Sequence, residues 1–302
     1  MDALSSLEAS VLNKVQTACN YVNAEVVRLR HQTIAIAAVC AAGAMLLWFV
    51  TGFGDARIAL VVAAGVVSFA FVRARNELAS SYKNIAAKRI VAGLGKELKY
   101  NHTSSLTRQQ FIAMDLFADR CERWSSRDEI AGRTRGVRYS LHRARASAKD
   151  RRAPFFEGVI IKIDFGDNFP GHTVTLPDSD GRALTGGGNG SNGAASRRKK
   201  DLVMLKNPAF ERLFDVYSTD YYEARQLVTP KFMEVVIDAQ TRLATELRLC
   251  FVQKSLFIAV AGGGDSLRFD ASLFAEPLTP QAAVGNLMQL VSIAERLAEL
   301  RS

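Results

Sequence analysis

The feature that most constrains this chain is an uncharged apolar run of 21 residues, TIAIAAVCAAGAMLLWFVTGF, from Thr33 to Phe53. A helix of about 20 apolar residues is long enough to cross the hydrocarbon core of a bilayer. A second apolar segment, IALVVAAGVVSFAFV, follows at Ile58–Val72 after a short turn. The sequence therefore predicts a transmembrane helical hairpin over 33–72, with spans at 33–53 and 56–72.

The second segment is short for a membrane span. It covers roughly 22 Å at about 1.5 Å per residue, against a hydrocarbon thickness of about 30 Å. Arg57, Arg73 and Arg75 flank it, and such long side chains can extend their charges to the membrane surface. A signal peptide is disfavoured because 32 residues precede the first run and a second run follows it. A buried hairpin in a soluble domain is the remaining alternative.

Basic residues set the expected orientation of the hairpin. They flank it on both sides, whereas the turn between the spans carries one Arg and one Asp: Lys14, Arg28 and Arg30 precede it, and Arg73, Arg75, Lys83, Lys88 and Arg89 follow it. Because basic residues favour the cytoplasmic side of a membrane, we expect both termini in the cytoplasm.

Two helical segments are predicted beside the hairpin. Residues 1–32 carry apolar side chains at intervals of three and four, which indicates an amphipathic helix. Self-association of this helix and packing on its own chain are equally compatible with the pattern. After the hairpin, 76–125 is predicted to be a helical connector that begins with a helix at 77–99.

The remaining residues, 126–302, are predicted to form a cytoplasmic α+β domain. Runs rich in β-branched and aromatic residues indicate strands at 155–165, 172–176 and 202–206, and a pair of strands, LRLCFVQ and SLFIAVA, within 247–261. The apolar spacing of 280–300 predicts a closing helix, and the glycine-rich composition within 181–200 predicts a flexible loop. We expect an antiparallel sheet with packed helices, compatible with a pleckstrin-homology-like barrel.

A basic run occupies residues 133–152 of this domain, in a chain of net charge +9. Such charges attract an anionic membrane surface, each by about 1 kcal/mol. Nucleic acid is not expected as a partner because no aromatic platform accompanies the charges, and a solvated face without a partner is the alternative. The predicted lipid-facing residues are Arg133, Arg135, Arg138, Arg143, Arg145, Lys149, Arg151 and Arg152, extended by Arg197–Lys200.

The densest passage of the sequence is FERLFDVYSTDYYEARQLVTPKFME, residues 210–234. Asp220 suits a helix N-cap, with Glu223 three positions later as in a capping box. Thr229 before Pro230 suits a second N-cap, since proline is well tolerated at the first helical position. The passage is therefore predicted to be a joint made of a strand, a short helix, a break and a long helix.

Three side chains in this passage are not explained by helix ends: Tyr217, Arg225 and Glu234. Arg225 would either form a structural ion pair, with Glu211, Asp215 or Glu234, or bind an anionic ligand through its planar guanidinium. The structural pair is favoured because ion pairs outnumber binding sites.

Neither a catalytic nor a metal site is predicted. The four cysteines and four histidines are scattered without metal-ligand spacing. The glycine cluster near residue 187 lacks the Lys-Ser/Thr ending of a phosphate-binding loop. We expect no cofactor and no metal, and a hydrolase is the weakest functional hypothesis.

Three blocks resemble the bacterial "domain of unknown function 3137" family: YKNIAAKRIVAGLGKELKY, FFEGVIIKIDFGDNFPGHTVTLPD and LKNPAFERLFDVYSTDYYEARQLVTPKFME. The resemblance covers the chain from about Tyr82 onward. It implies two N-terminal membrane segments followed by a cytoplasmic domain, in the bacterial inner (plasma) membrane, with a LemA-like membrane protein as a possible partner. The chain departs from the family pattern at WSSRDEIAG, residues 124–132, and in its polyglycine loop. The family implies no activity and hence no catalytic residue.

Together these features predict a membrane-anchored, non-enzymatic scaffold or adaptor whose basic face lies on anionic phospholipid. The alternative is a pleckstrin-homology-like domain that binds a lipid or small ligand, which a deep pocket lined by Arg225 would favour.

Overall fold

The computed structural model describes residues 2–51, 64–69, 71–73, 83–94, 97–149, 151–178, 200–262 and 280–301. The chain divides into two compact units. The first comprises Met1–Gly95 with Phe269–Ala283, and the second comprises Lys96–Arg268 with Val284–Ser302.

The first unit contains α1 (Asp2–Thr51) and α3 (Lys83–Gly93). Helix α1 runs without a break through both the predicted amphipathic segment and the first apolar run. Its Val15 and Cys19 are buried, and the Arg89 guanidinium of α3 lies 3.9 Å from the ring centroid of Tyr21. The N-terminal part of α1 thus packs on its own chain.

None of the helices, over the residues that the structure describes, is long and apolar enough to span a membrane. The predicted second span falls mainly outside these residues, since only 64–69 and 71–73 of it are described. The predicted flexible loop also lies outside them, except for Lys200.

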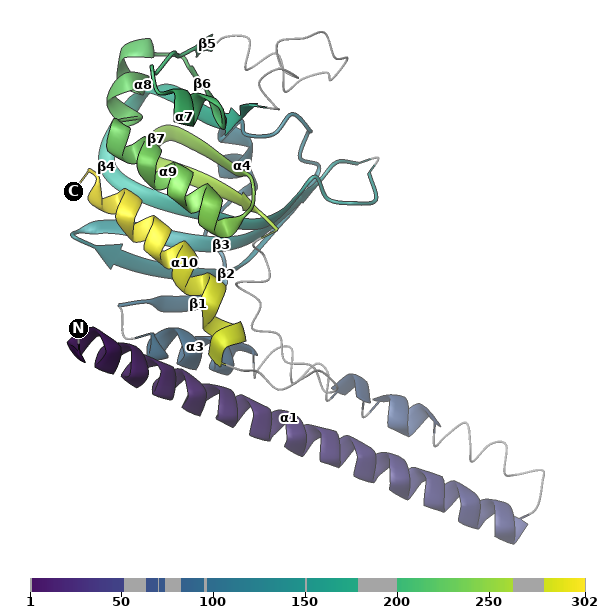
Figure 1. The fold of residues 1–302 in the computed structure, drawn as a ribbon. Coiled ribbons are helices and arrows are strands. Elements are labelled where there is room, and N and C mark those ends of the chain that lie inside the picture. Colours follow the sequence, from purple (N-terminus) through teal and green to yellow (C-terminus); the bar gives the residue numbers. More distant parts are fainter. Residues whose placement is uncertain are drawn as a thin grey trace. The chain divides into compact units, whose positions relative to one another are not determined.

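The second unit is built on a seven-stranded antiparallel sheet (Figure 1). Its strand order is β1-β2-β3-β4-β6-β5, and β7 pairs with β4 off this path. The strands are β1 (Lys99–Thr103), β2 (Arg123–Thr134), β3 (Val137–Ser147), β4 (Phe156–Pro177), β5 (Asp201–Leu202), β6 (Phe214–Ser218) and β7 (Leu247–Ala261). The predicted α+β class with an antiparallel sheet and packed helices is confirmed.

The long strand β4 organises the sheet. Its first half lies between β3 and β7, and its second half lies between β7 and β6. The sequence predicted two strands here, 155–165 and 172–176, whereas the structure has one. Gly166, at φ +89°, and the register shifts between Asp164 and Thr173 let the strand bend without ending. Strand β7 likewise continues through Gln253, at φ +57°.

Helices cover both faces of the sheet (Figure 1). On one face lie α9 (Pro230–Leu243) and α10 (Pro280–Glu299), and the Tyr139 hydroxyl of β3 donates to Glu295 of α10 at 2.9 Å. Burial and this carboxylate raise the pKa of Tyr139, so the phenol remains a donor. The predicted closing helix at 280–300 is confirmed.

On the opposite face lies α4 (Arg108–Ala113). Phe111 of this helix is buried, and its ring lies 4.5 Å from the Trp124 ring of β2, centroid to centroid. Phe156 and Ile160 of β4 belong to the same apolar cluster. A core therefore exists on each side of the sheet.

The predicted helical connector at 76–125 is wrong for its second half. Residues 97–125 contain β1, α4 and the start of β2. Strand β1 is only five residues long and gains its hydrogen bonds from pairing with β2, so local periodicity does not reveal it. The strand predicted at 202–206 is present only at its first residue, because β5 covers Asp201–Leu202, where it pairs with β6.

Candidate functional site

The dense passage at 210–234 is a structural joint, as predicted. Strand β6 is followed by α8 (Tyr221–Leu227) and then α9. The Asp220 carboxylate accepts from the Glu223 amide at 3.0 Å, and the Thr229 hydroxyl accepts from the Phe232 amide at 3.3 Å. The expected capping box is incomplete, since the Glu223 carboxylate accepts from the Gly171 amide of β4 at 2.7 Å instead. That contact ties α8 to the sheet.

The three unexplained side chains of this passage lie on different elements: Tyr217 on β6, Arg225 on α8 and Glu234 on α9. Arg225 is exposed and contacts Tyr221, one turn earlier on its own helix, at 3.4 Å. Glu211, proposed as its ion-pair partner, accepts from the backbone amides of Leu205 and Lys206. The predicted ion pair of Arg225 with Glu211, Asp215 or Glu234 is not found among the described residues.

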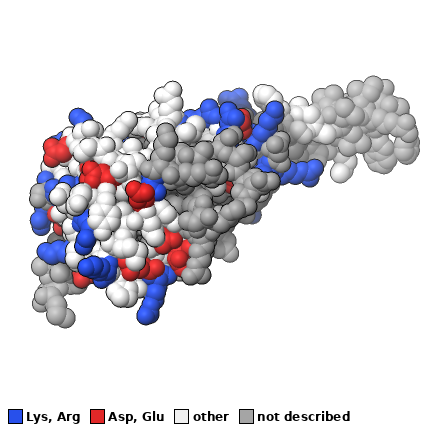
Figure 2. All heavy atoms as spheres, turned by 90° about the horizontal axis from the view of Figure 1, so that it is seen from above, with Lys and Arg blue, Asp and Glu red and all other residues white. Residues whose placement is uncertain are grey.

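The basic run lies on the β2–β3 hairpin, whose turn contains Arg135 and Gly136 with positive φ. Several members of the run lie close to carboxylates. Arg145 lies 3.7 Å from Glu157, Arg151 lies 3.2 Å from Asp119, Arg143 lies 3.7 Å from Asp128 and Arg135 lies 3.7 Å from Glu299. On the face shown in Figure 2, basic and acidic side chains are interspersed. The run is therefore partly neutralised.

Lys200, which was predicted to extend the basic face, is buried. Its ammonium lies 2.7 Å from Asp115, and only 2% of its side chain is exposed. The prediction is wrong for Lys200, because its ammonium pairs with the Asp115 carboxylate inside the domain. Arg197, Arg198 and Lys199 lie outside the described residues.

One place on the hairpin does concentrate positive charge. A hollow of about 220 Å³ is lined by Arg123, Trp124, Ser125, Arg145, Ser147 and Arg152, and we call it the basic hollow. The strand register explains this grouping, since Arg123 lies opposite Ser147 and Ser125 lies opposite Arg145. Side chains directly opposite in an antiparallel pair share one face of the sheet.

The basic hollow offers a donor-rich surface. The Arg123 guanidinium is held in place by the Ala148 and Arg151 carbonyl oxygens, at 3.2 and 2.8 Å. Three guanidinium groups and two hydroxyls suit the oxygens of a phosphate, which arginine binds with parallel hydrogen bonds. The basic run in the sequence indicates Arg145 and Arg152 but not Arg123, Ser125 and Ser147, which lie beside them only through the register of β2 and β3.

A buried polar network is built around His142 of β3, within the same hairpin. The ring of His142 contacts the Ser104 hydroxyl through Nδ1 at 2.9 Å and the Ser140 hydroxyl through Nε2 at 2.8 Å. Glu129 approaches Nδ1 at 3.7 Å. Burial lowers the pKa of His142 from 6.5 to about 4, so the ring is neutral at pH 7. A serine at Nε2 is what a hydrolase triad has, but here Nδ1 hydrogen-bonds to a second serine, Ser104, while the Glu129 carboxylate lies farther away, and the His142 ring is fully buried.

A second histidine, the half-buried His172, contacts the buried Cys250. Nε2 of His172 lies 3.1 Å from the Cys250 sulfur and 3.2 Å from the Met114 carbonyl oxygen. Cys250 is fully buried, and burial raises the pKa of its thiol. A protonated and inaccessible thiol is not a nucleophile. Among the described residues, no group of three or more His, Cys, Asp and Glu side chains is arranged to hold a metal ion.

Residues 155–299 match the model of the family described as "Protein of unknown function (DUF3137)". This part of the chain is similar to the DUF3137 family. The predicted resemblance is confirmed for this segment, which begins later than the expected Tyr82. The DUF3137 segment runs from β4 to α10, whereas the basic hollow lies on β2, β3 and the residues that follow β3.

No curated protein matches the chain. Among solved structures, the chain is similar to the crystal structure of the mycobacterial trehalose monomycolate transport factor A, TtfA, with 10% sequence identity and a TM-score of 0.34. The alignment covers 70% of this chain and 93% of that chain.

Proposed function

We propose that this chain is a membrane-anchored, non-enzymatic docking protein whose α+β domain binds the phosphate of an anionic lipid in the basic hollow. The observation that carries the proposal is the grouping of three guanidinium groups and two hydroxyls in one hollow of about 220 Å³. In this respect the domain would act on lipid headgroups as a pleckstrin-homology-like domain does.

The anchor in this proposal is the hairpin at 33–72. Its first segment is uncharged over 21 residues, and large apolar side chains on that part of α1 are exposed, among them Val39, Met45 and Phe49 at 69–85%. Lipid would cover such side chains favourably. Basic flanks on both sides put both termini in the cytoplasm, at the bacterial inner membrane. A LemA-like protein or a second copy of this chain would be its partner there.

We place lipid binding in the basic hollow and not along the whole basic run of residues 133–152. An arginine that already lies beside a carboxylate gains little from a lipid phosphate, because surface ion pairs are worth about 0–1 kcal/mol and the pair must be broken first. Arg152 has no carboxylate partner among the described contacts, and Arg123 is hydrogen-bonded only to neutral carbonyl oxygens. These two therefore keep their charge available for an anion.

The test uses the full chain in detergent micelles doped with phosphatidylglycerol or with phosphatidylcholine, and it measures the midpoint of thermal unfolding. A ligand that binds only the folded state raises this midpoint. We expect phosphatidylglycerol alone to raise it, by about 2–4 °C for each kcal/mol of binding, and salt to weaken the effect.

Two matched variants distinguish lipid binding in the hollow from an attraction that depends only on the net charge of the protein. Arg123→Gln/Arg152→Gln removes the two charges of the hollow that lie beside no carboxylate among the described contacts, and Arg133→Gln/Arg138→Gln removes two from the far end of the same hairpin. We expect the first to abolish the phosphatidylglycerol effect and the second to retain it. Equal loss in both variants would mean that only net charge matters, and the hollow would not be the site.

A further inference from the structure

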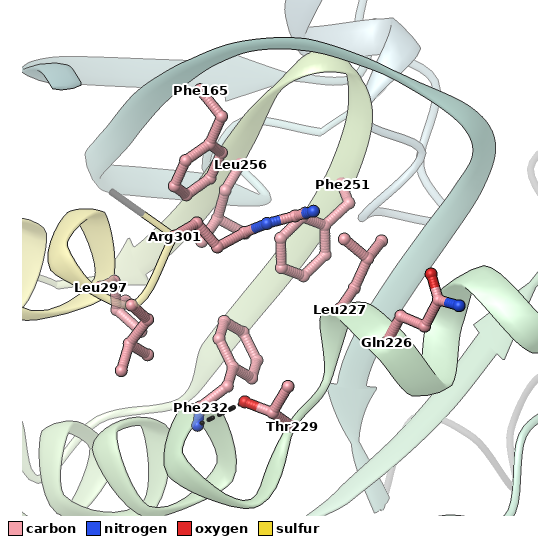
Figure 3. A pocket seen from close by; sticks show the side chains of 10 residues that line it. Phe165, Gln226, Leu227, Thr229, Phe232, Phe251, Leu256, Leu297 and Arg301 are labelled. Carbon is pink, nitrogen blue, oxygen red and sulfur yellow. Dashed lines mark hydrogen bonds between the residues drawn. The ribbon is translucent and has the colours of Figure 1, made fainter.

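A second cavity lies on the face of the sheet that α9 and α10 cover (Figure 3). It encloses about 220 Å³ between the end of α8, the start of α9, β7 and the end of α10. Its walls are mostly apolar: Phe165, Leu227, Phe232, Phe251, Leu256 and Leu297 line it. A protein interior contains few voids larger than a water molecule, so a space of this size is a candidate ligand site.

The joint in the dense passage makes this space. The break between α8 and α9 separates Leu227 from Phe232, and both side chains point into the cavity (Figure 3). Phe232 packs on Phe251 of β7, with ring centroids 5.4 Å apart, and this contact forms the floor. The Thr229 hydroxyl is used to cap α9. The apolar walls are therefore rigid, since helix caps and ring packing hold them.

One cation borders the cavity. The Arg301 guanidinium lies 5.1 Å from the Phe169 ring centroid and 5.7 Å from that of Phe165. In Figure 3 the Arg301 side chain reaches across the space toward Phe251. No acidic side chain is among the residues that line the cavity in the described part of the chain. Stacking on aromatic rings leaves the N–H edge of a guanidinium able to bind a planar anion through two hydrogen bonds.

We propose that this cavity binds a single unbranched alkyl chain with an anionic head, the chain between Phe232, Leu256 and Leu297 and the head on Arg301. The cavity is smaller than the roughly 300–1,000 Å³ of drug-sized ligand pockets, so it takes one short chain and excludes a sterol or a two-chain lipid. A carboxylate of a fatty acid and the phosphate of a single-chain lipid share this chemistry. The site does not depend on the basic hollow, with which it shares no residue.

The test is calorimetric titration of the full chain in phosphatidylcholine nanodiscs, with empty nanodiscs as the blank. The probes are octanoate, octyl phosphate and octanol. We expect at least one of the two anions to bind about tenfold or more tightly than octanol, because a charge-assisted hydrogen bond is lost with the alcohol. Lengthening the preferred anion by one methylene should tighten binding about fourfold until the cavity is filled. Preference for octanoate identifies a fatty acid as the ligand, and preference for octyl phosphate identifies a lipid phosphate.

Variants locate the binding. Arg301→Gln should reduce anion affinity to that of octanol, while Arg225→Gln, an exposed arginine outside the cavity, should not change it. Both positions are exposed, so both variants should fold. Leu227→Phe should fill the cavity and lower the affinity of every probe. Arg123→Gln/Arg152→Gln should bind octanoate and octyl phosphate as the wild type does, whether or not the basic hollow binds lipid phosphate. Equal affinity for anions and octanol, or unchanged binding by Arg301→Gln, would overturn the assignment.

Discussion

The buried imidazole of His142 should make the stability of this domain depend on pH. The ring is fully buried between Ser104 and Ser140, and Glu129, Lys162 and Asp164 are the charged groups that act on it. Desolvation is the largest influence and disfavours the protonated form, which lowers the pKa of His142 from 6.5 to about 4. The folded domain therefore resists protonating this ring, whereas the unfolded chain protonates it below pH 6.5.

The direction of the effect follows from proton binding. Between about pH 4 and pH 6.5 the unfolded state binds more protons at His142 than the folded state does, so the free energy of unfolding falls as the pH falls. The slope approaches about 1.4 kcal/mol per pH unit within this window. A difference of about 2.5 in pKa corresponds to roughly 3 kcal/mol in total. Above pH 6.5 the His142 ring is neutral in both the folded and the unfolded state, so it no longer makes the free energy of unfolding depend on pH.

The assay is urea unfolding of the full chain from pH 7 to pH 4, followed by Trp124 fluorescence in a Trp48→Phe background. Trp124 packs on Phe111 within the same domain, so its emission reports the unfolding of that domain. The His142→Gln variant keeps a polar amide beside the two serines but cannot take up a proton. We expect the stability advantage of the wild type over this variant to shrink by about 3 kcal/mol from pH 7 to pH 4.

A His31→Gln control replaces an exposed histidine on α1 and should follow the wild-type curve. Parallel curves for the wild type and His142→Gln would refute the reasoning, because they would mean that the ring is protonated equally in both states.

Three further predictions concern a buried hydrogen bond, two glycines and a buried thiol. Tyr100→Phe removes the 2.6 Å hydrogen bond to the buried Asp128 carboxylate and should lower the free energy of unfolding by about 2 kcal/mol in urea titrations. Gly158→Ala should cost about 3 kcal/mol or more, because its methyl group would overlap the β7 backbone, whereas Gly285→Ala in α10 meets nothing and should stabilise by up to about 1 kcal/mol. Cys250 should remain unmodified by a thiol reagent until urea unfolds the chain, as mass spectrometry of its peptide would show.

Local signals in the sequence predicted several elements correctly. The caps Asp220 and Thr229 and the proline that begins α9 depend on neighbouring residues only, and the structure has them as expected. The apolar spacing of α10 is equally local. Strand β1 and the single long β4 were missed, because a strand exists through its partner and a bend is tolerated where pairing resumes beyond it.

The candidate sites were less predictable than the elements. Arg145 and Arg152 stood out as members of a basic run, yet Arg123 lies 22 positions before Arg145 and joins them only through the register of β2 and β3. Arg225 attracted attention by its neighbours in the sequence but lies exposed beside Tyr221. The apolar cavity at the joint between α8 and α9 is instead bordered by Arg301, which lies far later in the sequence.

The sequence by itself determined the α+β class of the domain, the joint between α8 and α9, and the long uncharged run that begins at Thr33. The joint and the run depend on residues close together in the chain, and the class follows from the apolar pattern of each segment. Only the tertiary structure decided which basic side chains lie beside a carboxylate. Arg143, Arg151 and Lys200 each lie beside a carboxylate from a distant segment. Electrostatic interaction depends on distance in space, and folding sets that distance independently of separation along the chain.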